Sequence, residues 1–152
     1  MAPATSPTNP PDNLPDNLPT NPLAAMVQTL ALPHIERHLF LCCDQTKPKC
    51  CDKAASLEAW DYLKRRLTEL GLDRPTATRP TCIFRTKANC LRVCTAGPIL
   101  VVYPDGVWYR NATTEVIERV LQEHILGNQV VTEYAFLSHP LPPAVPLTNL
   151  NP

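Results

Sequence analysis

The 152-residue chain has the length of one ordinary compact domain, and 44% of its residues are hydrophobic, enough for a single core. Fourteen Lys and Arg residues balance fourteen Asp and Glu residues, so no global charge excess favours nucleic acid or an anionic membrane as a partner. No apolar run approaches the roughly 20 residues that span a bilayer, and the N-terminus lacks a basic segment followed by an apolar one. We therefore expect a cytoplasmic protein that neither spans a membrane nor carries a secretory signal.

Proline is concentrated at the two ends of the chain. Eight of the 18 prolines lie in residues 1–33 and five in residues 140–152, and a Pro-Asp-Asn-Leu segment is repeated over residues 11–18. Such segments bury too little apolar surface to offset the entropy of ordering them. We predict a largely disordered Pro/Asn-rich extension over residues 1–33 that includes a helical turn near residues 24–32. A folded domain over residues 34–139 and a flexible Pro-rich tail complete the chain.

The first predicted elements form a β-α-β unit. The apolar run that ends at Cys42 predicts a buried strand over residues 35–42. After a polar loop, apolar residues at helical spacing predict a helix that ends before Gly71, where a left-handed cap is expected. Residues 81–86 are partly β-branched or aromatic and predict a second strand. The apolar face of the helix consists of Leu57, Trp60, Leu63, Leu67 and Leu70.

A hairpin and a second helix follow this unit. Residues 98–103 and 107–109 are apolar runs separated by a Pro-Asp-Gly turn sequence. Residues 116–125 repeat apolar side chains on one helical face, with Thr113 or Thr114 as the N-cap. A β-α-β unit followed by β-β-α is the layout of a thioredoxin-like α/β sandwich, in which helices flank a small mixed sheet.

Seven cysteines are numerous for a chain of this length. Because thiols in a reducing cytoplasm do not form structural disulfides, clustered cysteines indicate metal binding or redox chemistry. Two loops that contribute two ligands each would supply the four thiolates of a 2Fe-2S cluster. Zinc sites more often use paired knuckles with two intervening residues, so a C-x3-C spacing fits zinc less well. The cysteines are Cys42, Cys43, Cys50 and Cys51 before the first helix, Cys82 in a strand, and Cys90 and Cys94 in the second loop.

Three segments closely resemble the thioredoxin-like 2Fe-2S ferredoxin family: residues 38–42, residues 89–94 and residues 97–109. A cysteine pair, a Gly-Pro step and a strand-turn-strand ending in Trp-Tyr recur in the family's order, and the resemblance runs from about Pro33 to Phe136. The family includes small bacterial ferredoxins and is related to the small cluster-bearing subunit of NADH:quinone oxidoreductases. The resemblance implies one 2Fe-2S cluster and an electron carrier rather than an enzyme.

Carried over residue by residue, the resemblance places the first ligand at Cys42 and the third and fourth at Cys90 and Cys94. The second ligand falls in a loop that is shorter than the family's and ends in two adjacent cysteines. Alignment of the basic residue that follows the family's cysteine selects Cys50, and Cys51 is the alternative.

Two other functions compete with the electron carrier. One is a structural zinc module on the same fold, which would need four converging thiolates but no inorganic sulfide. The other is a thiol-disulfide oxidoreductase that uses Cys42 and Cys43 or Cys90 and Cys94, although no C-x-x-C follows the first strand. Cys43 and Cys82 are assigned to the core, because free cysteine often packs as a small hydrophobe.

A local excess of positive charge accompanies the predicted ligands: residues 47–92 hold eleven basic and five acidic side chains. Positive charge near an anionic cluster favours the reduced form and would steer an acidic redox partner. The resemblance also implies a homodimer. Trp108 and Tyr109 are interpreted as packing residues of the hairpin, and His124 as structural. The basic residues expected nearest the cluster are Lys47, Lys49, Arg85, Lys87 and Arg92.

Overall fold

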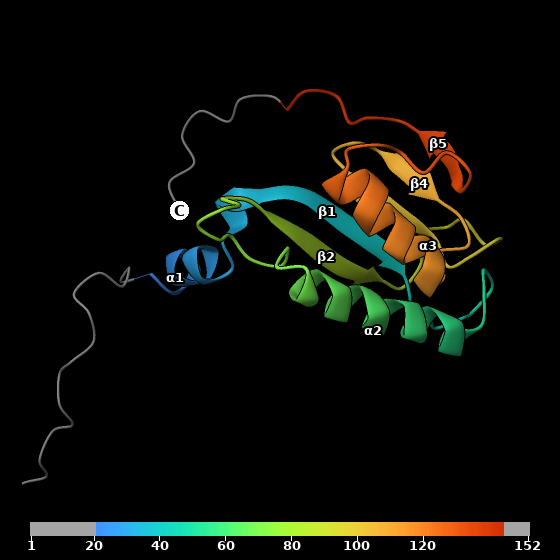
Figure 1. The fold of residues 1–152 in the computed structure, drawn as a ribbon. Helices are drawn as coiled ribbons and strands as arrows, with labels where there is room; N and C mark the ends of the chain where they lie inside the picture. The colour runs from blue at the N-terminus through green and yellow to red at the C-terminus, as the bar shows by residue number, and fades with distance from the viewer. Residues whose placement is uncertain (1–20, 145–152) are drawn as a thin grey trace, which may run out of the picture.

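The computed structural model describes residues 21–144 and has a mixed five-stranded sheet with the strand order β2-β1-β3-β4-β5 (Figure 1). Strands β1 and β2 are parallel, whereas β3, β4 and β5 continue the sheet in antiparallel pairs. This arrangement confirms the predicted thioredoxin-like α/β fold. The strands are β1 (Ile35–Cys42), β2 (Cys82–Ala88), β3 (Leu100–Tyr103), β4 (Val107–Tyr109) and β5 (Ala135–Ser138).

The two predicted helices are present with the expected ends. Helix α2 (Lys53–Glu69) is followed by Gly71 at φ 65°, a left-handed conformation that glycine adopts without steric strain. Helix α3 (Thr114–Arg119) begins at Thr113, whose side chain accepts a hydrogen bond from the Val116 backbone N–H. It continues directly as the π-helical segment η2 (Val120–Leu126), which the sequence pattern did not distinguish from an ordinary helix.

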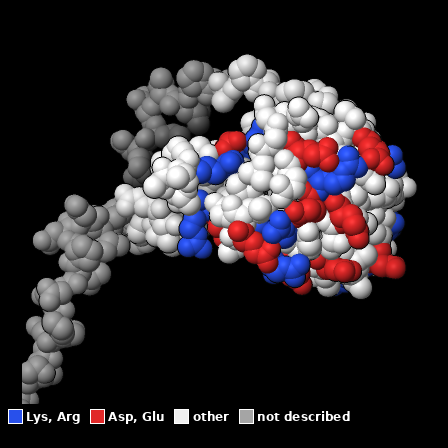
Figure 2. Space-filling model, viewed as in Figure 1, with Lys and Arg blue, Asp and Glu red and all other residues white. Residues whose placement is uncertain are grey.

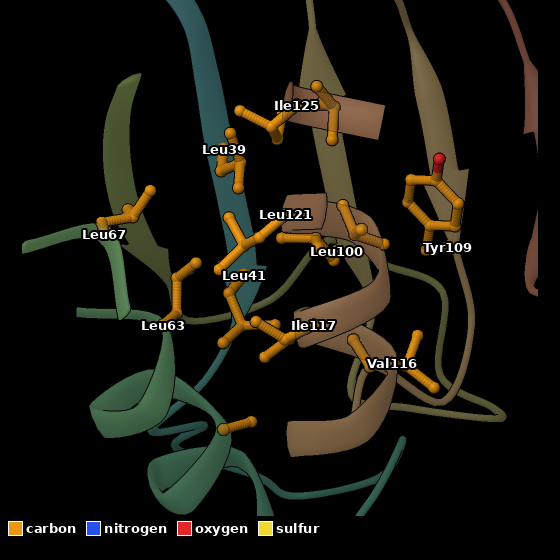
Figure 3. Packing of buried hydrophobic residues seen from close by; sticks show 14 of the residues in the cluster. Leu39, Leu41, Leu63, Leu67, Leu100, Tyr109, Val116, Ile117, Leu121 and Ile125 are labelled. Carbon is orange, nitrogen blue, oxygen red and sulfur yellow. The ribbon is translucent and has the colours of Figure 1, made fainter. Parts of the chain in front are cut away.

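Both helices cover one face of the sheet, where the hydrophobic core lies (Figures 1 and 3). Leu39 and Leu41 point from β1 toward these helices because alternate residues of a strand share a face. Full burial of one such side chain stabilises the fold by about 1.5–3 kcal/mol. The core contacts shown in Figure 3 come from Leu63 and Leu67 of α2, Leu100 and Tyr109 of the hairpin, and Val116, Ile117, Leu121 and Ile125 of the second helix.

The N-terminal region contains a helix where a helical turn was predicted near residues 24–32. Residues 1–20 of the predicted extension lie outside the described part of the chain. The remainder forms helix α1 (Pro22–Thr29), which starts two residues before the predicted turn, and the 3-10 turn η1 (Leu32–His34). The Asn21 side chain accepts a hydrogen bond of 2.9 Å from the Leu23 backbone N–H, and proline at the first helical position has the required φ. A local capping signal therefore starts a helix that buries none of its residues.

The C-terminal region contains one element that the sequence did not predict. Strand β5 pairs with β4 at the edge of the sheet, although most of its residues are exposed. Residues 140–144 have no regular secondary structure, and the rest of the predicted tail lies outside the described residues. Among residues 21–144, no helix combines the length and apolar character needed to cross a bilayer.

Charged side chains connect the two core helices at their surface. Arg66 of α2 donates two hydrogen bonds of 2.8 Å to the Glu118 carboxylate of α3, and the Tyr62 hydroxyl donates a third of 2.9 Å. The Arg66 guanidinium lowers the pKa of Glu118 to about 2. Figure 2 shows that basic and acidic side chains are interspersed over this face of the molecule.

We predict that Glu118→Gln lowers the free energy of unfolding at pH 7 by about 1 kcal/mol, the scale of a partly exposed ion pair. Because the folded pKa lies below the usual value of 4.5, the carboxylate's contribution is complete above that pH and is lost as the pH falls toward 2. Denaturant unfolding at several pH values, followed by circular dichroism, should show that the difference in unfolding free energy between the variant and the parent narrows as the pH falls. Glu58→Gln, on the exposed side of α2, is the matched control; an equal loss in both variants would contradict the prediction.

Candidate functional site

The parallel pairing of β1 and β2 brings the two cysteine-containing loops together. Cys42 at the end of β1 lies in register with Ala88 at the end of β2. Because parallel strands present their carboxyl ends at the same edge of a sheet, the loop over residues 43–52 and the loop over residues 89–99 emerge side by side. Residues about 50 positions apart in the chain thus share one site.

A small pocket lies between these loops and contains the cysteines predicted as ligands. Cys51 is absent from its lining, and the Cys51 sulfur lies 3.9 Å from that of Cys50. Cys43 and Cys82 are buried elsewhere, at 1% and 0% exposure, as expected for packing residues. The pocket is lined by Cys42, Gln45, Lys47, Lys49, Cys50, Cys90, Val93 and Cys94.

The sulfur geometry of the first loop fits a tetrahedral metal centre. The Sγ atoms of Cys42 and Cys50 lie 3.7 Å apart. Two sulfurs at about 2.3 Å from one tetrahedral metal lie about 3.8 Å from each other, so this pair matches two ligands of one metal, as does the Cys50–Cys51 pair at 3.9 Å. Cys42 is 2% exposed, whereas Cys90 and Cys94 on the facing loop are exposed. Within residues 21–144, no three His, Cys, Asp or Glu side chains meet the spacing for a single ion.

Backbone hydrogen bonds hold the two loops in this arrangement. The Cys42 N–H donates to the Ile99 carbonyl at 2.8 Å, and the Gly97 N–H donates to the Cys50 carbonyl at 3.0 Å. The Asn89 side-chain amide donates to the Asp44 carbonyl at 3.2 Å. The positions of the cysteines are therefore fixed by contacts between the loops as well as by the sheet.

The second loop also directs a donor at a sulfur. Arg92 has a φ of 65°, a left-handed conformation that is uncommon for a residue with a side chain. In this conformation its backbone N–H donates to the Cys90 Sγ at 3.2 Å. Such a donor stabilises negative charge on the sulfur.

Gln45 is a site residue that the sequence pattern did not identify. It is 3% exposed, and its amide Nε2 lies 3.3 Å from the Cys50 Sγ, 3.6 Å from the Cys51 Sγ and 3.9 Å from the Cys42 Sγ. Its Oε1 accepts a hydrogen bond of 3.0 Å from the Ser56 hydroxyl. A buried polar residue within a cysteine loop has no motif of its own, so only the structure reveals this contact.

Burial determines the acidity of several of these thiols in the metal-free chain. Desolvation by burial raises the pKa of Cys42 and of Cys43. Burial, followed by the neighbouring Cys50 charge, raises the pKa of Cys51 to about 11. Cys42 is the predicted ligand among these three, and its ionisation requires a compensating cation or hydrogen-bond donors.

The basic residues expected near the ligands occupy four different environments. Lys47 and Lys49 are exposed and line the pocket. Lys87 instead pairs with Asp44 at 3.0 Å, and this carboxylate also binds Lys53 at 2.9 Å. The remaining two differ again, because Arg92 approaches Cys90 through its backbone and Arg85 lies beside α2 in a groove with Asp61, Lys64, Arg65, Thr68 and Glu69.

Comparisons with known proteins find 2Fe-2S ferredoxins among the relatives of this chain. No family model matches the chain. A 2Fe-2S ferredoxin of Aquifex aeolicus is 29% identical over 114 residues, which cover 72% of this chain and 96% of the relative. A protein from Priestia megaterium whose name assigns it as a 2Fe-2S ferredoxin is 30% identical over 101 residues, covering 66% of this chain and 70% of the relative.

Solved structures support the same fold. The structure of a thioredoxin-like 2Fe-2S ferredoxin from Aquifex aeolicus superposes with a TM-score of 0.57 at 23% identity, covering 73% of this chain and 99% of that one. A cysteine-to-serine variant of that ferredoxin gives a TM-score of 0.53 at 25% identity, with coverage of 67% and 99%. By its fold and its relatives, this chain belongs to the thioredoxin-like 2Fe-2S ferredoxin family.

Proposed function

We propose that the chain is a cytoplasmic electron carrier, without enzymatic activity, that holds one 2Fe-2S cluster on Cys42, Cys50, Cys90 and Cys94. The observation that carries this proposal is the pocket in which these cysteines meet from two loops. When bound, such a cluster supplies one-electron redox chemistry without bond-making on a substrate. The protein's own residues fix the thiolates, limit access of water and tune the charge around them.

The choice of Cys50 over Cys51 rests on contacts with the facing loop. Cys50 lines the pocket and lies near Cys42, and the Gly97 backbone packs directly against it. A Cβ added at Gly97 would lie 2.8 Å from both the Cβ and the Sγ of Cys50, which is closer than side chains tolerate. Glycine at position 97 therefore leaves the space that Cys50 occupies, which supports Cys50 as the second ligand.

We predict that serine replacement distinguishes ligands from bystanders. Cys42→Ser, Cys50→Ser, Cys90→Ser and Cys94→Ser should each lower the iron and sulfide content or change the visible and EPR spectra, because an alkoxide or hydroxyl replaces a thiolate. Cys51→Ser, Cys43→Ser and Cys82→Ser are the matched controls and should retain two irons, two sulfides and the parent spectra. If the Cys51→Ser variant has an altered cluster content or spectrum and the Cys50→Ser variant does not, the second ligand is Cys51.

The same measurements separate the competing functions. A structural zinc module would be colourless, would contain zinc without sulfide and would lose zinc on Cys90→Ser. A thiol-disulfide oxidoreductase would contain neither metal nor sulfide and would lose disulfide reductase activity in that variant. Either result would overturn the ferredoxin proposal.

We further propose that the redox partners dock through acidic surfaces at the cysteine loops. The exposed ligands Cys90 and Cys94 mark the side of the pocket nearest to solvent. Lys47 and Lys49 are exposed on its rim, so positive charge lies beside the point where an electron would enter or leave. Charge at this position increases the association rate with a partner of opposite sign.

We predict that the variant Lys47→Gln/Lys49→Gln slows oxidation of the reduced protein by the anionic tris(oxalato)cobaltate(III) and speeds oxidation by the cationic hexaamminecobalt(III). Stopped-flow absorbance at low ionic strength measures both rates, and added salt should reduce the difference between them. Lys64→Gln/Arg65→Gln on α2 is the matched control. Equal responses of both variants would show that the rim does not steer reagents to the cluster.

A homodimer, as the family resemblance implies, is also part of the proposal. The face of the sheet opposite the core helices presents a row of aromatic rings: His38 stacks on Phe40 at 4.1 Å between centroids, and Phe40 contacts Tyr103 edge-on at 6.2 Å. Trp108 continues this row on β4 and is only half-buried. A surface of this composition resembles the centre of a protein interface more than ordinary solvated surface.

We predict a solution mass of twice the 16.9 kDa chain, measured by light scattering after size-exclusion chromatography. Phe40→Gln should shift the mass toward the monomer while circular dichroism and cluster content stay unchanged. The exposed-site variant Gln129→Leu serves as a control. A monomeric parent at high micromolar concentration would refute the dimer.

A further inference from the structure

We propose that Gln45 is a built-in hydrogen-bond donor to the ligand thiolates that raises the reduction potential of the cluster, and that Ser56 is the residue that positions it. This inference rests on the proposed function, because it requires a cluster on Cys42 and Cys50. It goes beyond that function in assigning a tuning role to residues that are not ligands.

Position and burial make Gln45 distinctive within the site. Its Nε2 atom faces three sulfurs within 3.9 Å, and the shortest of these distances, 3.3 Å to the Cys50 Sγ, is that of a hydrogen bond to sulfur. The side chain is 3% exposed, so water does not compete for the amide hydrogens. An amide group has two N–H donors and can serve two of these sulfurs at once.

Ser56 explains why the amide points its donors at the sulfurs. This residue lies in the first turn of α2 and is fully buried. Its single hydroxyl hydrogen has two acceptors within reach, the Gln45 Oε1 at 3.0 Å and the Lys53 backbone carbonyl at 2.8 Å, and shares its donation between them. Its oxygen also accepts the Asp44 backbone N–H at 3.3 Å, which fixes it against the loop. The reverse orientation would aim the Gln45 carbonyl oxygen at ionised thiolates, an arrangement that electrostatic repulsion disfavours.

The effect on potential follows from the charge change. Reduction adds one negative charge to a site that is already anionic, so a fixed donor at a ligand sulfur stabilises the reduced form more than the oxidised form. The low exposure of the amide strengthens this interaction relative to a surface contact. We expect its removal to favour the oxidised form by about tenfold, which is about 59 mV for a one-electron couple.

The test compares midpoint potentials of the full-length holoprotein and its variants by EPR-monitored redox titration. Gln45→Leu removes the donors at similar volume and should lower the potential. Ser56→Ala retains the donors but releases the amide, so it should lower the potential by a smaller amount. Gln129→Leu, the same substitution at an exposed position outside the pocket, should leave the potential unchanged.

A second readout detects the hydrogen bond itself. Exchange of the parent into heavy water should shift iron-sulfur stretching bands in the resonance Raman spectrum, because exchangeable amide hydrogens contact the sulfurs. Gln45→Leu should lose the part of this shift that comes from the amide. Ser56→Ala should lose a smaller part of it. A purely structural role for Gln45 would lower stability or loading without removing a specific isotope shift.

The outcomes separate this inference from the proposed function. A parent that binds no cluster after anaerobic reconstitution would refute both. A loaded parent with a reversible couple, together with variants whose potential and isotope shifts match the parent, would refute only the role of Gln45. If Gln45→Leu does not load, Ser56→Ala decides the question, since a parent-like potential and isotope shift in that variant would also overturn the inference.

Discussion

The parallel hydrogen-bonded pairing of β1 with β2 is the constraint on which the site depends. Its register places Cys42 opposite Ala88, so the two loops that follow start next to each other at one edge of the sheet. A parallel pair requires a crossover, which α2 supplies, and α2 in turn packs on the sheet through Leu63 and Leu67. Core packing and ligand placement are therefore consequences of the same β-α-β unit, and a shift of one residue in this register would turn Cys42 toward the opposite face of the sheet.

Around the cysteines, polar groups hold the loops together in addition to the burial of Cys43 and Ile99. Gly97 and Asn89 donate hydrogen bonds across from one loop to the other, and Gln45 is anchored to the start of α2 through Ser56. This framework orients donors toward sulfur in advance and leaves little reorganisation for a change in charge. Cys90 and Cys94, which we propose as ligands, are exposed, so in our proposal a redox partner approaches from their side of the pocket.

Most of the fold could be predicted because its core elements have strong local patterns. The apolar run before Cys42, the leucine spacing of α2 and the Pro-Asp-Gly turn each indicated one element, and all three are present. Strand β5 was not predicted, because it buries no hydrophobic face and depends on edge pairing with β4. Helix α1 was predicted only as a helical turn near residues 24–32, because it buries none of its residues and its start depends on the Asn21 cap. Family resemblance selected the ligand candidates, but adjacent cysteines have identical local chemistry, so Cys50 and Cys51 differ only in tertiary contacts. The role of Gln45 depends on such contacts entirely.

The central claim, that one cluster is shared between the two loops, is tested most directly by anomalous diffraction at the iron edge from crystals of the anaerobically purified holoprotein. We expect two adjacent iron peaks in the pocket, with density continuous to the sulfurs of Cys42 and Cys50 on one side and of Cys90 and Cys94 on the other. A single metal peak, or irons bonded to Cys51 or to cysteines of only one loop, would contradict the account.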